Sequence, residues 1–159
     1  MPDLTRRDVI LITSINPNAK LIGVDISGVD LSGLDLSGIN LRRANLAGAN
    51  LSRAILRGAD LEEANLAGAS LCEADIEGAN LKGACLVGAD LTDINGQFAD
   101  LRKTDLREAK LEQANLRGSD LREANLTGVP LLTANVRDAA VSGTQSGHKL
   151  LGGWGKRQS

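Results

Sequence analysis

The chain has almost no aromatic residues. Phe, Trp and Tyr make up 1% of its 159 residues, as one Phe, one Trp and no Tyr. A conventional globular core of this size normally uses more of these large side chains. Proline is also rare, with three residues, whereas glycine is frequent, with 18. This composition favours a chain of many short, similar turns over a single core packed around aromatic rings.

Strong charge and long apolar segments are missing as well. The formal net charge is -2, from 18 basic and 20 acidic residues, so no overall basic field attracts nucleic acid. The apolar run at residues 9–12 is shorter than the core of a signal peptide, and no segment approaches the length of a membrane span. We therefore expect a cytoplasmic protein that binds neither nucleic acid nor membrane.

No pattern in the sequence indicates catalysis, a metal or a cofactor. The cysteines, Cys72 and Cys85, occupy different positions of the repeat described below, and we expect free thiols. His148 is the only histidine and has no nearby cluster of Cys or carboxylate residues. Because Ser/His/Asp arrangements, phosphate-binding loops and metal-ligand spacings are absent, we expect a protein that is not an enzyme and needs no cofactor.

An aliphatic residue recurs at every fifth position from Leu21 to Val141, and only Gly96 breaks the series. We call this residue the centre of the repeat. A smaller apolar residue, usually Ala, stands two positions before it. On a helix, five residues advance roughly 500°, which scatters the centres around the axis. On a flat strand, an odd period sends successive centres to opposite faces. The chain must therefore turn a corner every five residues in the same sense, which closes it into a coil.

The other positions of the repeat carry turn residues. Asp or Asn commonly precedes the centre, where its short side chain can bond the nearby backbone. The two positions after the centre are the corner. Its second position is commonly Gly, which supplies the positive φ of a type II turn. Where this position holds a charged residue such as Arg43 or Glu63, we expect a type I-like turn instead.

Tandem units of the form A-[DN]-L-x-x resemble the repeats of the pentapeptide-repeat protein family. Residues 44–48, Ala-Asn-Leu-Ala-Gly, and 59–63, Ala-Asp-Leu-Glu-Glu, are close to its consensus. The resemblance covers roughly four-fifths of the chain and implies an all-β solenoid. The family's fold is a right-handed quadrilateral β-helix with four pentapeptides per coil, which gives about six coils here.

Three segments are expected on this basis. Residues 1–18 form an N-terminal cap with a short α-helix at 6–14, opened by a capping box of Thr5 and Asp8 and ended by Pro17. Residues 19–143 form the β-helix. Residues 144–159 form a flexible C-terminal tail, in which Trp154 is a candidate protein contact.

Stacking of four repeats per coil places residues twenty positions apart on the same face. One face, which includes Arg42, Glu62 and Lys82, mixes both signs of charge. We expect a solvated ladder of ion pairs there rather than a docking strip. A second face carries small uncharged residues, Ala47, Ala67 and Val87, beside glycines, and is a candidate contact surface for another protein.

Gly96 and Phe98 are the main departure from the repeat. Gly96 occupies a centre and leaves a gap, while Phe98 stands in a corner. We expect the Phe98 ring to fold over or into that gap, and the alternative is an exposed contact residue. Pro130 replaces the usual Asp or Asn and lacks an N–H, which we expect the end of the coil to tolerate.

The sequence favours a non-catalytic interaction or scaffold module that acts as a monomer on an unidentified protein partner. The resemblance offers a second interpretation, because quinolone-resistance members of the family mimic duplex DNA and bind DNA gyrase. Those members rely on a strongly acidic surface and a long dimeric rod. This chain differs in its net charge of -2, its mixed charges and its short repeat segment. Its regularity is also similar to that of cyanobacterial family members whose roles are unassigned.

Overall fold

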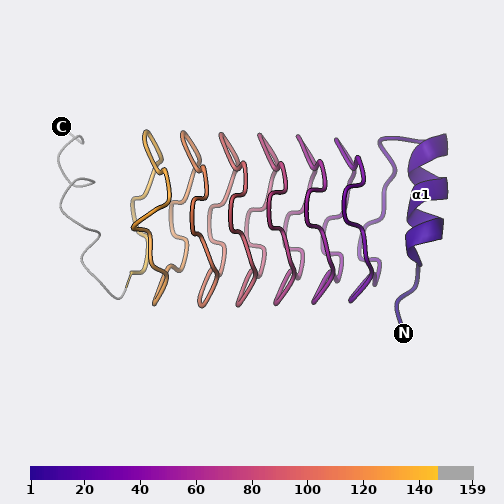
Figure 1. The fold of residues 1–159 in the computed structure, drawn as a ribbon, viewed down its shortest axis with the longest axis horizontal. Coiled ribbons are helices and arrows are strands. Elements are labelled where there is room, and N and C mark those ends of the chain that lie inside the picture. The colour runs from indigo at the N-terminus through magenta and orange to yellow at the C-terminus, as the bar shows by residue number, and fades with distance from the viewer. Residues whose placement is uncertain (147–159) are drawn as a thin grey trace.

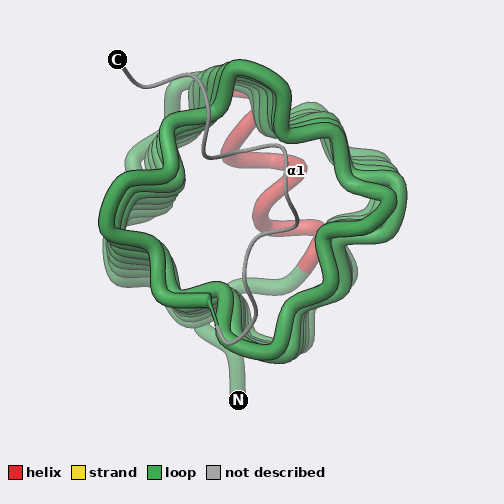
Figure 2. Tube along the Cα trace, turned by 90° about the vertical axis from the view of Figure 1, so that its left-hand side faces the viewer, coloured by secondary structure: helices red, strands yellow, loops and turns green. Residues whose placement is uncertain are grey.

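The computed structural model shows a stack of four-sided coils with one helix at its N-terminal end (Figures 1 and 2). The structure describes residues 1–146. Parallel bridges join residues of neighbouring coils at a constant step, as in Lys20 with Asn40 and Asn45 with Asn65. This step of 20 residues equals four pentapeptides, so the predicted four-sided coil is confirmed.

The β-structure of the stack is only one residue wide on each side. Over residues 1–146, the bridges are isolated and none extends into a longer strand. The paired residue is the one before the centre, as in Asp60, whose N–H donates to the Ile39 carbonyl at 2.9 Å. The Leu61 N–H donates in turn to the Asn80 carbonyl at 2.7 Å. A corner every five residues leaves no room for a longer ladder, so the solenoid is built from single rungs.

The core consists of columns of centre residues with columns of small residues between them. Centres such as Leu61, Leu81 and Leu121 are fully buried, and so are small residues such as Ala64 and Ala84. Burial of one such leucine contributes about 2 kcal/mol. Stacked aliphatic columns thus replace the aromatic-rich core that the composition excludes.

Corners with glycine and corners with charged residues share one backbone conformation. φ is 64° at Gly48, 57° at Arg43 and 58° at Glu63. The Ala44 N–H closes one such corner by donating to the Leu41 carbonyl at 3.0 Å. A positive φ at the third residue of a four-residue turn is the mark of type II, so the expected type I-like corner is wrong. A side chain in this region costs roughly 1–2 kcal/mol, which the hydrogen bonds between coils offset.

Helix α1 spans Arg6–Ile15 and opens with the predicted capping box. The Thr5 N–H donates to the Asp8 carboxylate at 2.8 Å, and the Thr5 hydroxyl accepts from the Asp8 N–H at 3.3 Å. Val9 is the buried residue of α1, which lies across the N-terminal end of the coils (Figure 2). No helix within residues 1–146 has both the length and the apolar character needed to span a membrane.

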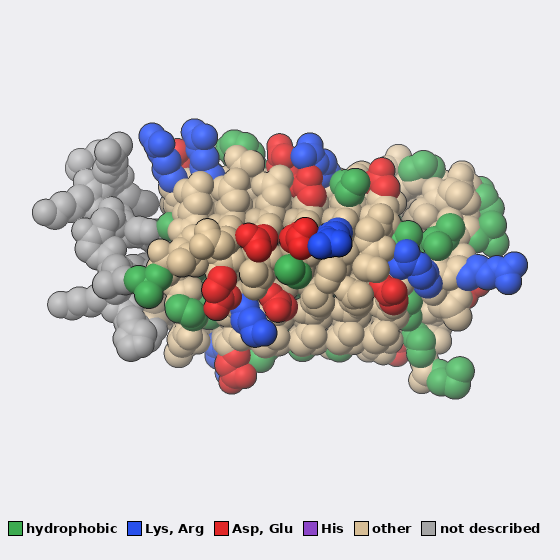
Figure 3. All heavy atoms as spheres, in the orientation of Figure 1, with side chains coloured by type: hydrophobic (Ala, Val, Ile, Leu, Met, Phe, Trp, Pro, Cys, Tyr) green, Lys and Arg blue, Asp and Glu red, His purple; other side chains and the backbone are tan. Residues whose placement is uncertain are grey.

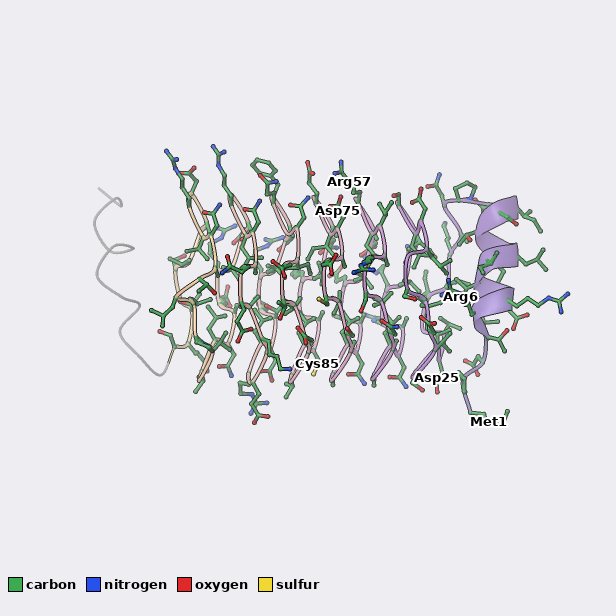
Figure 4. All side chains as sticks on the ribbon, viewed as in Figure 1. Met1, Arg6, Asp25, Arg57, Asp75 and Cys85 are labelled. Carbon is green, nitrogen blue, oxygen red and sulfur yellow. The ribbon has the colours of Figure 1, made fainter. Side chains whose placement is uncertain are left out.

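The first coil has backbone carbonyls that no preceding coil can pair, and the N-terminal segment bonds several of them. Arg6 points from α1 toward the coils (Figure 4). Its guanidinium donates to the carbonyls of Asp30 at 2.8 Å and Ser32 at 3.0 Å. The Asp3 N–H donates to the Asp25 carbonyl at 2.6 Å. These donors stand where the N–H groups of an earlier coil would be, so on the sides of Asp25 and Asp30 the edge is not free to pair with another chain.

The opposite end of the stack is less regular. Within the described part of the chain, Lys110 forms no bridge with Pro130, whereas the next side keeps the bridge between Asn115 and Asn135. The Gln113 N–H donates instead to the Thr133 hydroxyl at 3.1 Å. Pro130 is therefore tolerated near the end of the stack, as expected, with the loss of one rung.

Candidate interaction surfaces

The gap that the sequence predicts at Gly96 is already filled by neighbouring coils. A Cβ atom built on Gly96 would lie 2.7 Å from Leu116 Cδ2 and 3.5 Å from Ile76 Cδ1. Phe98 does not enter the core, because 62% of its surface is exposed. The expectation that its ring fills the gap is therefore wrong: the aliphatic side chains above and below Gly96 reach the space first.

Phe98 stands instead on a corner column that is otherwise mainly glycine. The column consists of Gly38, Gly58, Gly78, Phe98, Gly118 and Asp138. The ring rests on the next residue of this column, since a Cβ on Gly118 would lie 2.7 Å from Phe98 Cε1. The φ of Phe98 is 57°, a left-handed conformation that bulky residues rarely adopt. The stack holds it there, with the Phe98 N–H donating to the Arg117 carbonyl at 3.1 Å.

The charged face forms the expected ladder of ion pairs. Arg42 lies 2.8 Å from Glu62, which also approaches Lys82 at 3.8 Å. Arg43 bonds Glu63 at 2.7 Å, and this hydrogen bond and the charge of Arg43 hold the pKa of Glu63 below its usual value. Basic and acidic side chains also lie beside one another on the face shown in Figure 3. The carboxylates Glu62 and Glu63 are therefore both held in ion pairs with basic residues of neighbouring coils.

A hollow opens toward the C-terminal end of the charged face. Its lining residues are Lys82, Arg102, Lys103, Arg122, Glu123 and Ser142. Their positive charges already have partners, because Arg102 and Arg122 bind Asp100 and Asp120 and Lys103 lies 3.6 Å from Glu123. Arg102 accordingly lowers the pKa of Asp100. A ligand anion would have to displace these carboxylates, so the hollow is not a candidate anion site.

The small-residue face carries short side chains beside hydrogen-bonded asparagines. Ala47, Ala67 and Val87 are half-buried between exposed glycine corners. The Asn65 side-chain amide donates to the Asn45 side-chain oxygen at 3.1 Å. Close approach of a second surface is sterically open here, because no atom lies within 4 Å of a Cβ built on the adjoining glycines Gly48, Gly68 and Gly88. Its use as a protein contact stays a prediction.

The two cysteines and one further ion pair have ordinary surroundings. Cys72 and Cys85 are both free and half-buried, as expected. Arg57 and Asp75 meet from neighbouring coils in an ion pair (Figure 4). Trp154 lies outside the described residues.

Sequence reasoning missed one apolar surface, the outer side of α1. Ile10, Leu11 and Ile15 are all exposed there. The spacing of Val9, Ile12 and Ile15 predicts one inner side of the helix. Val9 is buried and Ile12 is half-buried, but Ile15 is 76% exposed, so its placement on the inner side is wrong. The signal for the outer side was also present, since residues 11 and 15 lie one helical turn apart and residue 10 flanks them.

Comparisons with known proteins agree with the repeat pattern. A family model described as pentapeptide repeats (8 copies) matches residues 19–58, 54–93 and 97–139, and leaves residues 94–96 unmatched where Gly96 breaks the series.

Similar solved structures include the pentapeptide repeat protein Rfr23 from the cyanobacterium Cyanothece 51142. It is 27% identical over 86% of this chain and 96% of that chain, with a TM-score of 0.46. A pentapeptide repeat protein from the Arabidopsis thaliana thylakoid lumen is 31% identical over 79% of this chain and 74% of that one, with a TM-score of 0.40. QnrB1, a plasmid-mediated fluoroquinolone resistance protein, is 19% identical over 81% of this chain and 85% of that one, with a TM-score of 0.49. No curated protein matches the chain. Because the family model covers well over half of its residues, the chain belongs to the pentapeptide-repeat family.

Proposed function

We propose that the chain is a non-catalytic protein-interaction module. In this proposal, residues 19–143 form a right-handed rod of about six coils, α1 caps its N-terminal end, and the corner columns present side chains to a protein partner. The observation that carries the proposal is Phe98, an exposed aromatic residue in a strained left-handed corner. The stack imposes the same backbone conformation on ten other non-glycine corners of residues 1–146, so what sets Phe98 apart is its large apolar side chain, which is exposed.

The surroundings of Phe98 suit an interface. Gly78 precedes it on the same column, and no atom lies within 4 Å of a Cβ built there, so a partner can approach the backbone on that side of the ring. The ring itself already packs on Gly118, which reduces the freedom that it would lose on binding. Aromatic residues held in this way are typical centres of binding energy in protein interfaces. We therefore expect a partner with an apolar pocket that receives the ring.

The experiment uses Phe98→Gly, because glycine prefers the backbone conformation of this corner and the variant keeps its fold. Proteins of the source cell that bind the wild-type chain are identified by cross-linking and mass spectrometry. Those that use this surface are lost with Phe98→Gly. The matched control is Asp93→Gly, which makes the same change at an exposed corner with a φ of 57°. The proposal fails if both variants retain the same partners as the wild type.

Inhibition of DNA gyrase is not the function that we propose. A mimic of duplex DNA needs an unbalanced acidic surface, whereas the carboxylates of the charged face pair with cations such as Arg42 and Arg43. The likeness to QnrB1 is at 19% identity and concerns the fold alone. A supercoiling assay checks this choice directly. We expect no inhibition by the purified chain, and clear inhibition would reverse the order of the two functions.

A further inference from the structure

The exposed large aliphatic residues of the structure are concentrated at its N-terminal end. Within α1, the exposed fractions are 42% at Ile10, 58% at Leu11 and 76% at Ile15. Hydrophobic side chains are seen to gather over α1 in the space-filling view (Figure 3). Single exposed leucines are ordinary, but a cluster on one helix face marks a surface that is covered in the working protein.

The cluster has a defined register on the helix. Val9 faces the first coil and is buried, and Thr13, one turn later, is half-buried. At about 100° per residue, Leu11 points almost directly away from Val9. Ile10 and Ile15 flank Leu11 on its two sides. This outer face of α1, which we define by Arg7, Ile10, Leu11 and Ile15, is therefore centred on Leu11, close to the middle of the helix.

We propose that the outer face of α1 is covered by the same face of a second copy, with the two helices packed antiparallel about a two-fold axis near Leu11. Homodimers of this kind bring one surface against itself, so the surface must be complementary to itself. An apolar centre fulfils this condition, since Leu11 meets Leu11 and the flanking isoleucines close around the pair.

Charge gives the helices their direction. Arg7 lies in the first turn of α1, the end where a cation interacts poorly with the helix dipole. Its side chain makes no ion pair within residues 1–146, unlike that of Arg6. The last turn of α1 contains no basic residue, which leaves its negative end uncompensated. An antiparallel pair brings Arg7 of each copy to the last turn of the other helix, beside Ile15. A parallel pair would instead place the two arginines together.

The size of the face sets the strength of the contact. Three aliphatic side chains and one arginine per copy fall short of a standard interface of about 1,600 Å². The contact therefore belongs with weak, reversible interfaces below about 1,200 Å², and we expect dissociation in the micromolar range or above. The dimer leaves the rod sides free, so it is independent of the function proposed for Phe98. It replaces the monomer that the sequence favours.

Sedimentation equilibrium of the full chain from low micromolar to millimolar concentration tests the dimer. We expect a concentration-dependent dimer for the wild type. Leu11→Glu places two like charges at the axis and weakens association by roughly 100-fold. The matched control is Leu132→Glu, which adds the same charge at a residue that is 77% exposed in the less regular end of the stack, and it leaves the dimer intact. Far-UV circular dichroism checks that each variant keeps α1.

Mixing variants tests the contact of the outer face with itself at Leu11, whichever way the two helices run. If residue 11 of one copy meets residue 11 of the other, Leu11→Glu and Leu11→Arg do not dimerise alone but form a heterodimer when mixed. A heterodimer would support the proposal even if either variant is less stable than the wild type, because an unfolded chain would not associate through this face. A wild type that stays monomeric, an equal loss with Leu132→Glu, or no heterodimer in the mixture would each overturn the proposal. So would a monomer that binds vesicles of anionic phospholipid through the same face.

Discussion

Two successive levels on one side of the stack distribute side-chain volume in opposite ways. In the regular level, Ile76 fills the centre and Gly78 occupies the corner. One coil later, Gly96 occupies the centre and Phe98 the corner. The backbone does not change, since φ is 64° at Gly78 and 57° at Phe98, and the Phe98 level keeps its hydrogen bonds to the next coil.

The comparison shows that the coil is specified by columns rather than by single repeats. The Ile76 and Leu116 side chains close the space at Gly96 from the coils before and after it. One missing centre is thus compensated by its neighbours in the column. A missing glycine in the corner is not compensated in this way, because the side chain there projects outward and the backbone must bear the strain.

The largest expected effect on stability comes from shortening Ile76, because its side chain packs both at its own level and at the level of Gly96. Ile76→Ala removes atoms that pack at its own level and against Gly96, and we expect it to lower the free energy of unfolding by about 2–5 kcal/mol. Denaturant unfolding measures the change. Ile55→Ala, on the same side but 38% exposed, is the control, and we expect it to change stability by only about 0.5 kcal/mol. Equal losses for both would contradict the column account.

A smaller loss of stability is expected when the level of Gly96 and Phe98 is given an aliphatic centre. Gly96→Leu overpacks a space that Leu116 already occupies, and we expect it to cost about 1–3 kcal/mol. The double variant with Leu116→Ala should recover part of this loss, because the two side chains compete for one space. A double-mutant cycle measures the coupling. If Gly96→Leu alone stabilised the chain, a true cavity would have to exist at Gly96.

Removing the side chain at the corner should raise stability, whereas removing one at the centre lowers it. Phe98→Gly removes a left-handed side chain, and we expect a gain of about 1 kcal/mol. The mirror experiment is Gly78→Phe in the regular level, for which we expect a loss of about 1–2 kcal/mol. Thermal unfolding of the two variants gives the signs. A loss with Phe98→Gly would mean that the packing of the ring on Gly118 outweighs the strain.

The smallest expected effect is the pH dependence of stability that comes from the aspartates before the centres. Hydrogen bonds from the Ser37 hydroxyl and N–H lower the pKa of Asp35, and Arg107 lowers that of Asp105. Carboxylates with a lowered folded-state pKa stabilise the fold above their unfolded value, about 3.9, and lose this contribution as pH falls below it. We therefore expect the melting temperature to drop below about pH 4. Asp35→Asn keeps the acceptor oxygen without the titration, so its melting temperature should depend slightly less on pH in that range.

The structural features that could be predicted from the sequence were those set by the local spacing of residues. The five-residue period predicted a coil with a corner every five residues, and Thr5 with Asp8 predicted the start of α1. The four sides of the coil were implied by the resemblance to the pentapeptide-repeat family. The prediction of type I-like turns at the charged corners was wrong. Residue preference favours glycine at a positive φ, but the stack imposes this conformation on Arg43 and Glu63 as well. The bonds from Arg6 to the first coil had no sequence signal, because they join residues 24 and 26 positions apart.

The sequence by itself determined that this chain forms a coil with a corner every five residues, since a repeated local pattern dictates the same backbone path each time. Only the tertiary structure decided what the departures from the pattern do. Phe98 does not fill the space at Gly96, because the side chains of Ile76 and Leu116 reach it first. These two residues lie 20 positions before and 20 positions after Gly96. Likewise, Ile10, Leu11 and Ile15 became a surface only when Val9 was buried against the coils, because one helix cannot turn all of its aliphatic residues inward.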